Sequence, residues 1–374
     1  MSIPNVSIEL ANGQLGRVND IGNGYPGLIV VGLTAGIDHP LDAAKLYASV
    51  EKVEEVFDFS GKDSLKEAIQ NYFLESLGKP VYLMPVAAYA GATPADYKAY
   101  FSTKLQAMQN GSSDRVRFVG LVGMILDGNP AISEAMLAGQ SAAEELVKDY
   151  KPVSIYFSVK YASDLDDLTE ATYNRCGALI DDSGVYLGLL MGRLARIPVQ
   201  RNIGRVKDGS VSVLDAKIGV EPVESSLATV TVVYGKKYIC LRTYPGKAGY
   251  YFTDDPLAAP ATDDYSQISL RRVIDKVIMV AYGVYVEQVN DEILISSDGT
   301  IPPAVVKDLQ GLIENAINKQ MTNNGEISSV SAFIDHQQDV VGTGKLEIAV
   351  GIVPVGYTKE IIVKLGFENP NTSK

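Results

Sequence analysis

The chain contains 374 residues, of which 46% are hydrophobic and 21% are charged, and its formal net charge is −12. A single core usually stops growing at about 250–300 residues, so we expect at least two packed units. Residues 1–220 carry 20 basic and 26 acidic side chains and residues 221–374 carry 13 and 19, and this even acidity argues against a basic surface for nucleic acid or for an anionic membrane.

The first 20 residues are predicted to form an extended arm that carries one strand. Val6, Ile8 and Leu10 alternate with polar residues, which is the periodicity of a β-strand. A short strand has no stability alone, so we expect this one to pair with another sheet.

From about residue 26 to residue 200 the pattern alternates between strand and helix. The clearest helix is expected at 64–77, where Ser64 and Glu67 fit a capping box and Gly78 follows the end. This alternation predicts an α/β fold with a largely parallel sheet. The other strands are expected at 27–33, 81–86, 115–122, 153–159 and 178–180, and the other helices at 94–109, 133–148 and 165–173.

From about residue 205 the pattern becomes typical of an α+β unit. Two β-rich runs, 229–234 and 238–244, are predicted to form a hairpin around Gly235. Two long apolar helices are expected at 268–289 and 302–321, followed by strands at 327–335, 346–352 and 361–367. We therefore predict an extended arm at 1–20, an outer α/β domain at 21–204, an α+β core domain at 205–355 and a C-terminal strand or arm at 356–374.

Few residues are typical of catalysis. His39 and His336 lie in expected loops without an obvious catalytic partner, and Cys176 and Cys240 are expected to be buried free thiols. No Cys/His cluster has the spacing of a zinc site, and the Gly-rich loop 22–27 precedes a strand, whereas a phosphate-binding loop opens a helix. We expect no cofactor and no enzymatic activity.

Three pairs of neighbouring acidic residues, at 181–182, 254–255 and 263–264, offer oxygen ligands for a divalent cation. They lack the spacing of an EF-hand, so a metal site is the less favoured interpretation. Arg271 and Asp275 are four residues apart on an expected buried helix, which favours a structural ion pair.

The N-terminus does not have the pattern of a signal peptide. No segment reaches the ~18–20 unbroken apolar residues of a membrane helix. We therefore expect synthesis in the cytoplasm and no membrane insertion.

Several segments, taken in order, resemble contractile tail sheath proteins of phage tails and tail-like injection machines. In the first half they are 27–34 (GLIVVGLT), His39 with Pro40, 56–59 (VFDF), 68–73 (AIQNYF) and 79–83 (KPVYL). In the second half they are 242–265, which is similar to a sheath-like subfamily, 268–275 (ISLRRVID), and the closing strands 346–354 (LEIAVGIVP) and 360–365 (EIIVKL).

The resemblance implies a subunit that polymerises as stacked hexameric rings around an inner tube and contracts by repacking its inter-subunit contacts. Arms at both ends would add strands to the sheets of neighbouring copies, and both ends of this sequence carry an amphipathic strand with little local partner. The implied arm residues are Val6, Ile8, Leu10, Ile361, Val363, Leu365 and Phe367, and candidate tube contacts are Lys307, Asp308, Glu314 and Lys319.

The partners implied by the resemblance are other copies of the chain, an inner tube protein, and baseplate and terminator proteins. Nucleic acid is not among them. The subunit would be made in the bacterial cytoplasm and assembled in a phage tail or a contractile injection particle.

Two other classes of protein stay open. The chain could be another component of such an assembly, although a tube protein is usually smaller and mostly β, and a surface-layer protein should carry an export signal. An enzyme would assemble its site from distant residues, in a cleft at the carboxyl ends of the parallel strands.

Overall fold

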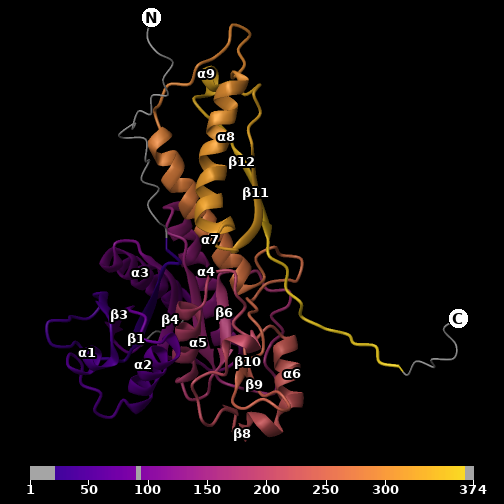
Figure 1. Cartoon of the computed structure of the whole chain (residues 1–374). Coiled ribbons are helices and arrows are strands. Elements are labelled where there is room, and N and C mark those ends of the chain that lie inside the picture. Colours follow the sequence, from indigo (N-terminus) through magenta and orange to yellow (C-terminus); the bar gives the residue numbers. More distant parts are fainter. Residues whose placement is uncertain (1–21, 90–93, 367–374) are drawn as a thin grey trace, which may run out of the picture.

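The computed structural model describes residues 22–89 and 94–366, and a six-stranded sheet lies at its centre (Figure 1). Its strands lie in the order β2 (Lys45–Tyr47), β3 (Val81–Val86), β1 (Tyr25–Val31), β4 (Val116–Leu126), β5 (Ser154–Val159) and β6 (Cys176–Ile180). The edge strand β2 is antiparallel to β3, and every other neighbouring pair is parallel. The largely parallel sheet predicted from the strand–helix alternation is confirmed.

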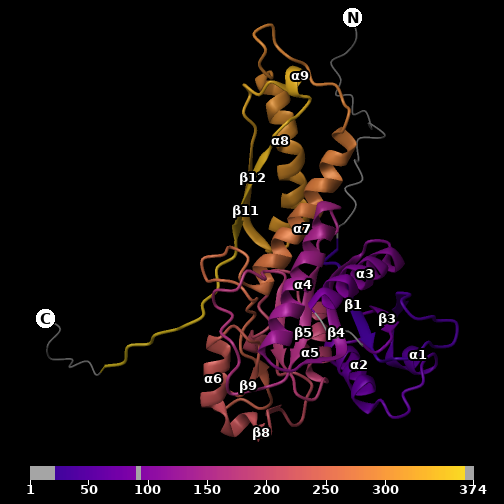
Figure 2. The same cartoon turned by 180° about the vertical axis from the view of Figure 1, so that it is seen from behind.

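Helices cover both faces of this sheet (Figure 2). One face packs against α2 (Asp63–Ser76) and α5 (Tyr186–Arg196), and the other against α3 (Pro94–Ser112) and α4 (Asn129–Lys148). Gly120 of β4 lies against Met191 of α5, whereas Phe157 of β5 lies against Gly139 of α4. Because both faces are covered, the strands are mostly apolar, and every residue of β3, β5 and β6 is buried.

The helices α2 and α5 approach closely because α5 carries two glycines one turn apart. A Cβ atom on Gly188 would lie 1.9 Å from the carbonyl oxygen of Ala68, and one on Gly192 would lie 2.7 Å from another backbone oxygen of α2. A buried ion pair joins the same helices, with Arg193 Nε 2.6 Å from Glu75 Oε1. Arg196 of α5 also lies 3.3 Å from Glu75, so backbone contact sets the spacing between these helices and two arginines share one buried carboxylate across it.

A buried ion cluster joins α7 (Ile268–Tyr285) to the sheet. Arg175, directly before β6, donates from both terminal guanidinium nitrogens to Asp275 at 3.1 Å, and Arg271 donates to the same carboxylate at 2.9 Å. Arg272 donates to two backbone carbonyl oxygens at the end of α5. The structural pair favoured by the spacing of Arg271 and Asp275 is present, with Arg175 as a third member.

The helix α7 and the elements after it form a second part of the molecule, which stands beyond the sheet in Figure 1. Here α8 (Pro303–Ile317) ends in one π-helical turn (Asn318–Thr322), and a two-stranded antiparallel hairpin follows, made of β11 (Ile327–Phe333) and β12 (Ala349–Pro354). Their shared core contains Val277, Val280, Ile313, Ile317 and Ile327. Two helices against a hairpin agree with the predicted α+β content.

The hairpin predicted around Gly235 is wrong. Its first run forms a helix, α6 (Leu227–Gly235), which buries Val230 and Val233. Its second run is extended but pairs elsewhere: the Ile239 amide donates to Ala178 O, and the Ile180 amide donates to Ile239 O. Pairing at the edge of the buried sheet replaces the local hairpin that the β-branched residues suggested.

Two predictions about helices are also wrong. The segment 165–173 forms turns, because Asp167 Oδ1 accepts a hydrogen bond from the Thr169 amide and the Leu168 amide donates to Lys236 O. The capping box of Ser64 does not form, because α2 begins one residue earlier and Lys62 is its N-cap.

The remaining elements are short. They are α1 (Val50–Glu54), β7 (Lys217–Ile218), β8 (Glu221–Pro222), β9 (Leu241–Arg242), β10 (Tyr251–Phe252), α9 (Val340–Thr343) and three 3₁₀ turns (Val206–Asp208, Val223–Ser225 and Val286–Gln288). Within residues 22–89 and 94–366, no helix combines the length and the apolar character that crossing a membrane requires.

One hydrophobic cluster includes side chains from Leu28 to Ile268, so residues between 205 and 258 share the core of the sheet. The position of the domain boundary, expected at residue 205, stays a prediction.

Substituting Gly188→Ala should destabilise the fold by about 1–3 kcal/mol, because the new methyl group cannot fit against the Ala68 carbonyl. Urea unfolding followed by circular dichroism would measure the change. Gly311→Ala is the matched control, since a Cβ there meets only an atom 3.9 Å away, and it should be neutral or stabilising. Equal effects of the two variants would contradict the close-packing interpretation.

Substituting Asp275→Asn should cost about 3–5 kcal/mol, because it leaves two buried guanidinium groups without their counter-charge. Thermal unfolding of the full chain would show a lowered midpoint. Asp308→Asn, on the exposed face of α8, should leave the midpoint unchanged. A midpoint for Asp275→Asn equal to that of the control would show that the cluster contributes no net stability.

Candidate functional site

The hairpin β11–β12 has one covered face and one exposed face. Val330, Ala332, Val350 and Ile352 pack against the core shared with α7 and α8. The opposite face is exposed, including Phe333. Among the described residues, neither outer edge pairs with another strand, so backbone N–H and C=O groups are available along both.

The four candidate tube contacts on and after α8 do not share one environment. Lys307, Asp308 and Lys319 are exposed. Glu314 is half-buried and accepts a hydrogen bond from the Ala332 amide at 2.7 Å. One N–H group of β11 is therefore already paired, and Glu314 holds the hairpin against the helix.

The residues after β12 form neither helix nor strand as far as Gly366. The side chains of Ile361, Val363 and Leu365 are 77%, 68% and 92% exposed. In Figure 1 this segment leads away from the body of the molecule. A strand at 361–367 was predicted, and the described part of it has an unpaired, extended course. The other predicted arm residues, Val6, Ile8, Leu10 and Phe367, lie outside the described residues.

Both members of the acidic pair at 181–182 bond to backbone amides: Asp182 accepts from Tyr161 and Gly219, and Asp181 caps a helix. The Asp181 carboxylate accepts hydrogen bonds from the backbone amides of Tyr186 at 2.9 Å and Leu187 at 3.0 Å, in the first turn of α5, and from Ser158 Oγ at 3.0 Å. Burial raises the pKa of Asp181, and these hydrogen bonds oppose that shift. Both oxygens of the Asp181 carboxylate therefore accept hydrogen bonds from groups of the same chain.

The acidic pair at 254–255 is engaged by protein groups as well. Asn202 Nδ2 lies 2.5 Å from an oxygen of each carboxylate, and Lys359 Nζ lies 2.5 Å from Asp254 Oδ2. The Ser269 amide donates to Asp255 at 3.0 Å. Burial, together with repulsion from Asp254, raises the pKa of Asp255 to about 7. Within residues 22–89 and 94–366, no cluster of three His, Cys, Asp or Glu residues is placed to hold a metal.

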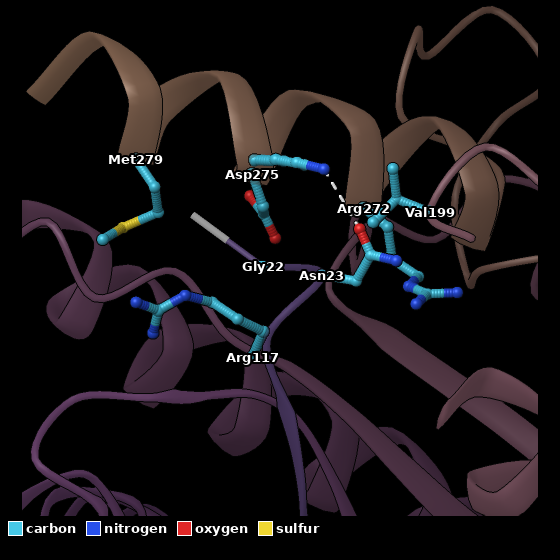
Figure 3. A pocket seen from close by; sticks show the side chains of 8 residues that line it. Gly22, Asn23, Arg117, Val199, Arg272, Asp275 and Met279 are labelled. Carbon is cyan, nitrogen blue, oxygen red and sulfur yellow. Dashed lines mark hydrogen bonds between the residues drawn. The ribbon is translucent and has the colours of Figure 1, made fainter. Parts of the chain in front are cut away.

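Figure 3 shows a cavity at the base of α7, lined by Arg117, Asp275, Met279 and the start of the described chain. Its free volume is about 20 Å³, which is room for about one water molecule. Lys276 crosses the same region and donates to Asn23 Oδ1 at 3.1 Å. A second cavity, of about 160 Å³, lies beside Asp254 and Lys359. Both are smaller than typical ligand pockets of about 300–1,000 Å³.

His39 has a structural environment. Nδ1 lies 2.7 Å from the hydroxyl of Tyr47 and Nε2 lies 2.6 Å from the carbonyl oxygen of Ala43. Burial lowers its pKa. His336 is exposed next to Asp335, and Cys176 and Cys240 are buried free thiols, as predicted.

Three charged residues with central roles were missed by sequence reasoning. Arg193 lies in an apolar helix, Arg175 directly precedes a buried strand, and Lys359 lies in the segment expected to be an arm. A charge within an apolar run was a usable signal for the two arginines, because a buried charge needs a partner. Nothing near Lys359 in the sequence indicated its distant partner.

Two family models cover the chain: the DUF2586 N-terminal domain matches residues 3–256 and the DUF2586 C-terminal domain matches residues 264–372. No curated protein matches the sequence.

Solved structures of contractile injection systems share the fold over the full length of the chain. The helical sheath of the anti-feeding prophage (AFP) in the contracted state matches with a TM-score of 0.69 and 14% identity, covering 98% of this chain and 100% of that chain. The PVC sheath complex in the contracted state matches at 0.62 and 13%, covering 99% of both chains. A chain of the six-fold symmetrised AFP baseplate matches at 0.63 and 15%, covering 99% and 100%. At these identities the likeness shows the fold alone.

The raised pKa of Asp255 predicts a pH-dependent effect of Asp255→Asn. Ionisation of the buried carboxyl lowers stability as pH rises from the unfolded pKa of about 4 to the folded value of about 7. The variant should therefore gain at least ~1 kcal/mol relative to the wild type between pH 5 and pH 8. Urea unfolding at both pH values would test it, with Asp264→Asn, at an exposed carboxylate, as the control that shows no such gain. The same difference at both pH values would contradict the raised pKa.

Proposed function

The chain belongs to the DUF2586 family, and we propose that it is a structural subunit of a contractile tail sheath. The observation that carries the proposal is the match of the whole chain, hairpin included, to sheath proteins of contractile injection systems. The small cavities and the structural use of His39 and of the acidic residues support a structural role over catalysis.

We propose that copies of the subunit join by strand addition. In the described part of the chain the outer edges of the hairpin pair with no other strand, and the projecting segment supplies exposed apolar residues at Ile361, Val363 and Leu365. A strand laid along an open edge pairs its backbone groups and covers its apolar side chains, which gives both affinity and register. The N-terminal residues Val6, Ile8 and Leu10 would act in the same way.

In this proposal the subunits form stacked hexameric rings around an inner tube, and contraction repacks the contacts between subunits while the arms keep the rings linked. The exposed Lys307, Asp308 and Lys319 are proposed to face the tube, whereas Glu314 supports the hairpin. Baseplate and terminator proteins are the proposed partners at the two ends, in a phage tail or a contractile injection particle assembled in the bacterial cytoplasm.

A second candidate is a baseplate component of such a particle, because a chain of the AFP baseplate has the same fold. A sheath subunit would polymerise into long tubes, whereas a baseplate component would stop at a ring.

The test is negative-stain electron microscopy of the full-length protein, expressed alone and with its neighbouring genes. Striated hollow tubes or stacked rings are the expected result. Single rings in both preparations would favour the baseplate component. Uniform monomers or small closed oligomers in both would overturn the assembly proposal.

The arms should be required for assembly and dispensable for folding. Deleting residues 1–20, or substituting Val363→Asn and Leu365→Asn together, should leave the thermal midpoint unchanged and abolish tubes, because the added strand loses its apolar face. Lys364→Gln, on the other side of the same segment, is the matched control and should assemble normally. Normal tubes from the arm variants would contradict strand addition.

A further inference from the structure

The C-terminal segment is attached to the body at two points before it projects. After β12 ends at Pro354, the Tyr357 hydroxyl donates to the carbonyl oxygen of Gln200. Two residues later the ammonium of Lys359 lies 2.5 Å from Asp254 Oδ2. From Glu360 to Gly366 every residue is exposed. Attachment therefore ends abruptly at Lys359.

The receiving site consists of two neighbouring buried carboxylates. Asp254 and Asp255 are bridged by Asn202 Nδ2, at 2.5 Å from an oxygen of each. The other donors are neutral: the Tyr234 hydroxyl reaches Asp254 at 2.9 Å and the Ser269 amide reaches Asp255 at 3.0 Å. Among the described residues, Lys359 is the cation that forms an ion pair with this site, through Asp254.

Two adjacent buried carboxylates without a cation are strongly unfavourable, because each is desolvated and repels the other. The Lys359 ammonium group of the C-terminal segment offsets this desolvation and repulsion when it lies against Asp254. Lys359 is thus bound by a site whose electrostatics require a cation. The cavity of about 160 Å³ beside the site, which Lys237 also lines, gives an added alkylammonium ion room to enter.

We propose that Asp254, Asp255 and Asn202 form an ammonium-binding site that holds Lys359 and thereby fixes where the C-terminal segment leaves the body. The consequence drawn for assembly rests on the proposed function: the exchanged arm begins at residue 360, and residues 355–359 stay with their own subunit. The site itself is a property of the single chain and can be tested without assembly.

Chymotrypsin cleavage after Tyr357 in the full-length protein reports on attachment, because a bound segment is protected and a released one is accessible. Because chymotrypsin also cleaves after Leu365 and Phe367, all peptides that begin at Thr358 would be quantified together by mass spectrometry after digestion under native conditions. Lys359→Gln should raise the cleavage rate about tenfold or more, which corresponds to ~1.4 kcal/mol of lost attachment. Lys364→Gln makes the same chemical change five residues further on, in the exposed part of the segment, and should cleave at the wild-type rate.

A competition experiment separates the site from a general loss of structure. In the wild type, added n-propylammonium should displace Lys359 from the site and speed cleavage, whereas tetramethylammonium, which has the same charge and no N–H donor, should not. Equal cleavage rates for the wild type, Lys359→Gln and Lys364→Gln would overturn the proposal, and so would equal effects of the two ammonium ions.

Electron microscopy of the same variants keeps this proposal distinct from the proposed function. If the wild type forms tubes, Lys359→Gln should form fewer or shorter ones, because its arms leave the body in varied directions. If the wild type forms no tubes but Lys359→Gln is cleaved faster, the ammonium site stands and the sheath function fails.

Discussion

The structure depends on a buried carboxylate. Asp275 lies between Arg175, from the strand layer, and Arg271, from its own helix, and this contact joins α7 to the sheet. The core of α8 and the hairpin is built on α7, so these elements have their position only because the base of α7 is held. The charged hydrogen bonds of this cluster are directional, and they therefore fix the position of α7 on the sheet more specifically than apolar contacts do.

Ion pairs join distant parts of the chain at three other places. Arg193 and Glu75 join α5 to α2, Lys276 and Glu326 join α7 to the turn before β11, and Lys359 and Asp254 join the C-terminal segment to the body. Except for Lys359, these charged side chains are nearly fully buried. Removing the partner of one of them would leave an unpaired buried charge and destabilise the fold.

The sequence allowed the parallel sheet and three of the helices that cover it, α2, α3 and α4, to be predicted, because continuous apolar runs such as β3 and periodic faces such as that of α2 are local signals. The helix α5, which covers the sheet as well, was not predicted. The hairpin predicted at 229–244 from β-branched residues is wrong. The second half of this segment pairs instead with the edge of the sheet, whose strand β6 lies about 60 positions earlier in the sequence. The candidate site was less predictable still. The acidic pair at 254–255 was visible, but its partner lies 105 positions away, and nothing local distinguishes a lysine that pairs from one that is solvated.

The two-stranded hairpin has a consequence for the production of this protein. Within residues 22–89 and 94–366, no other strand pairs with the outer edges of the hairpin, and such edges are templates for any extended chain, including a nascent or misfolded one. A free copy can therefore pair through these edges with such a chain. The evenly distributed negative charge of the chain opposes such encounters at long range, and pairing at the hairpin edges becomes favourable only when a strand arrives in register.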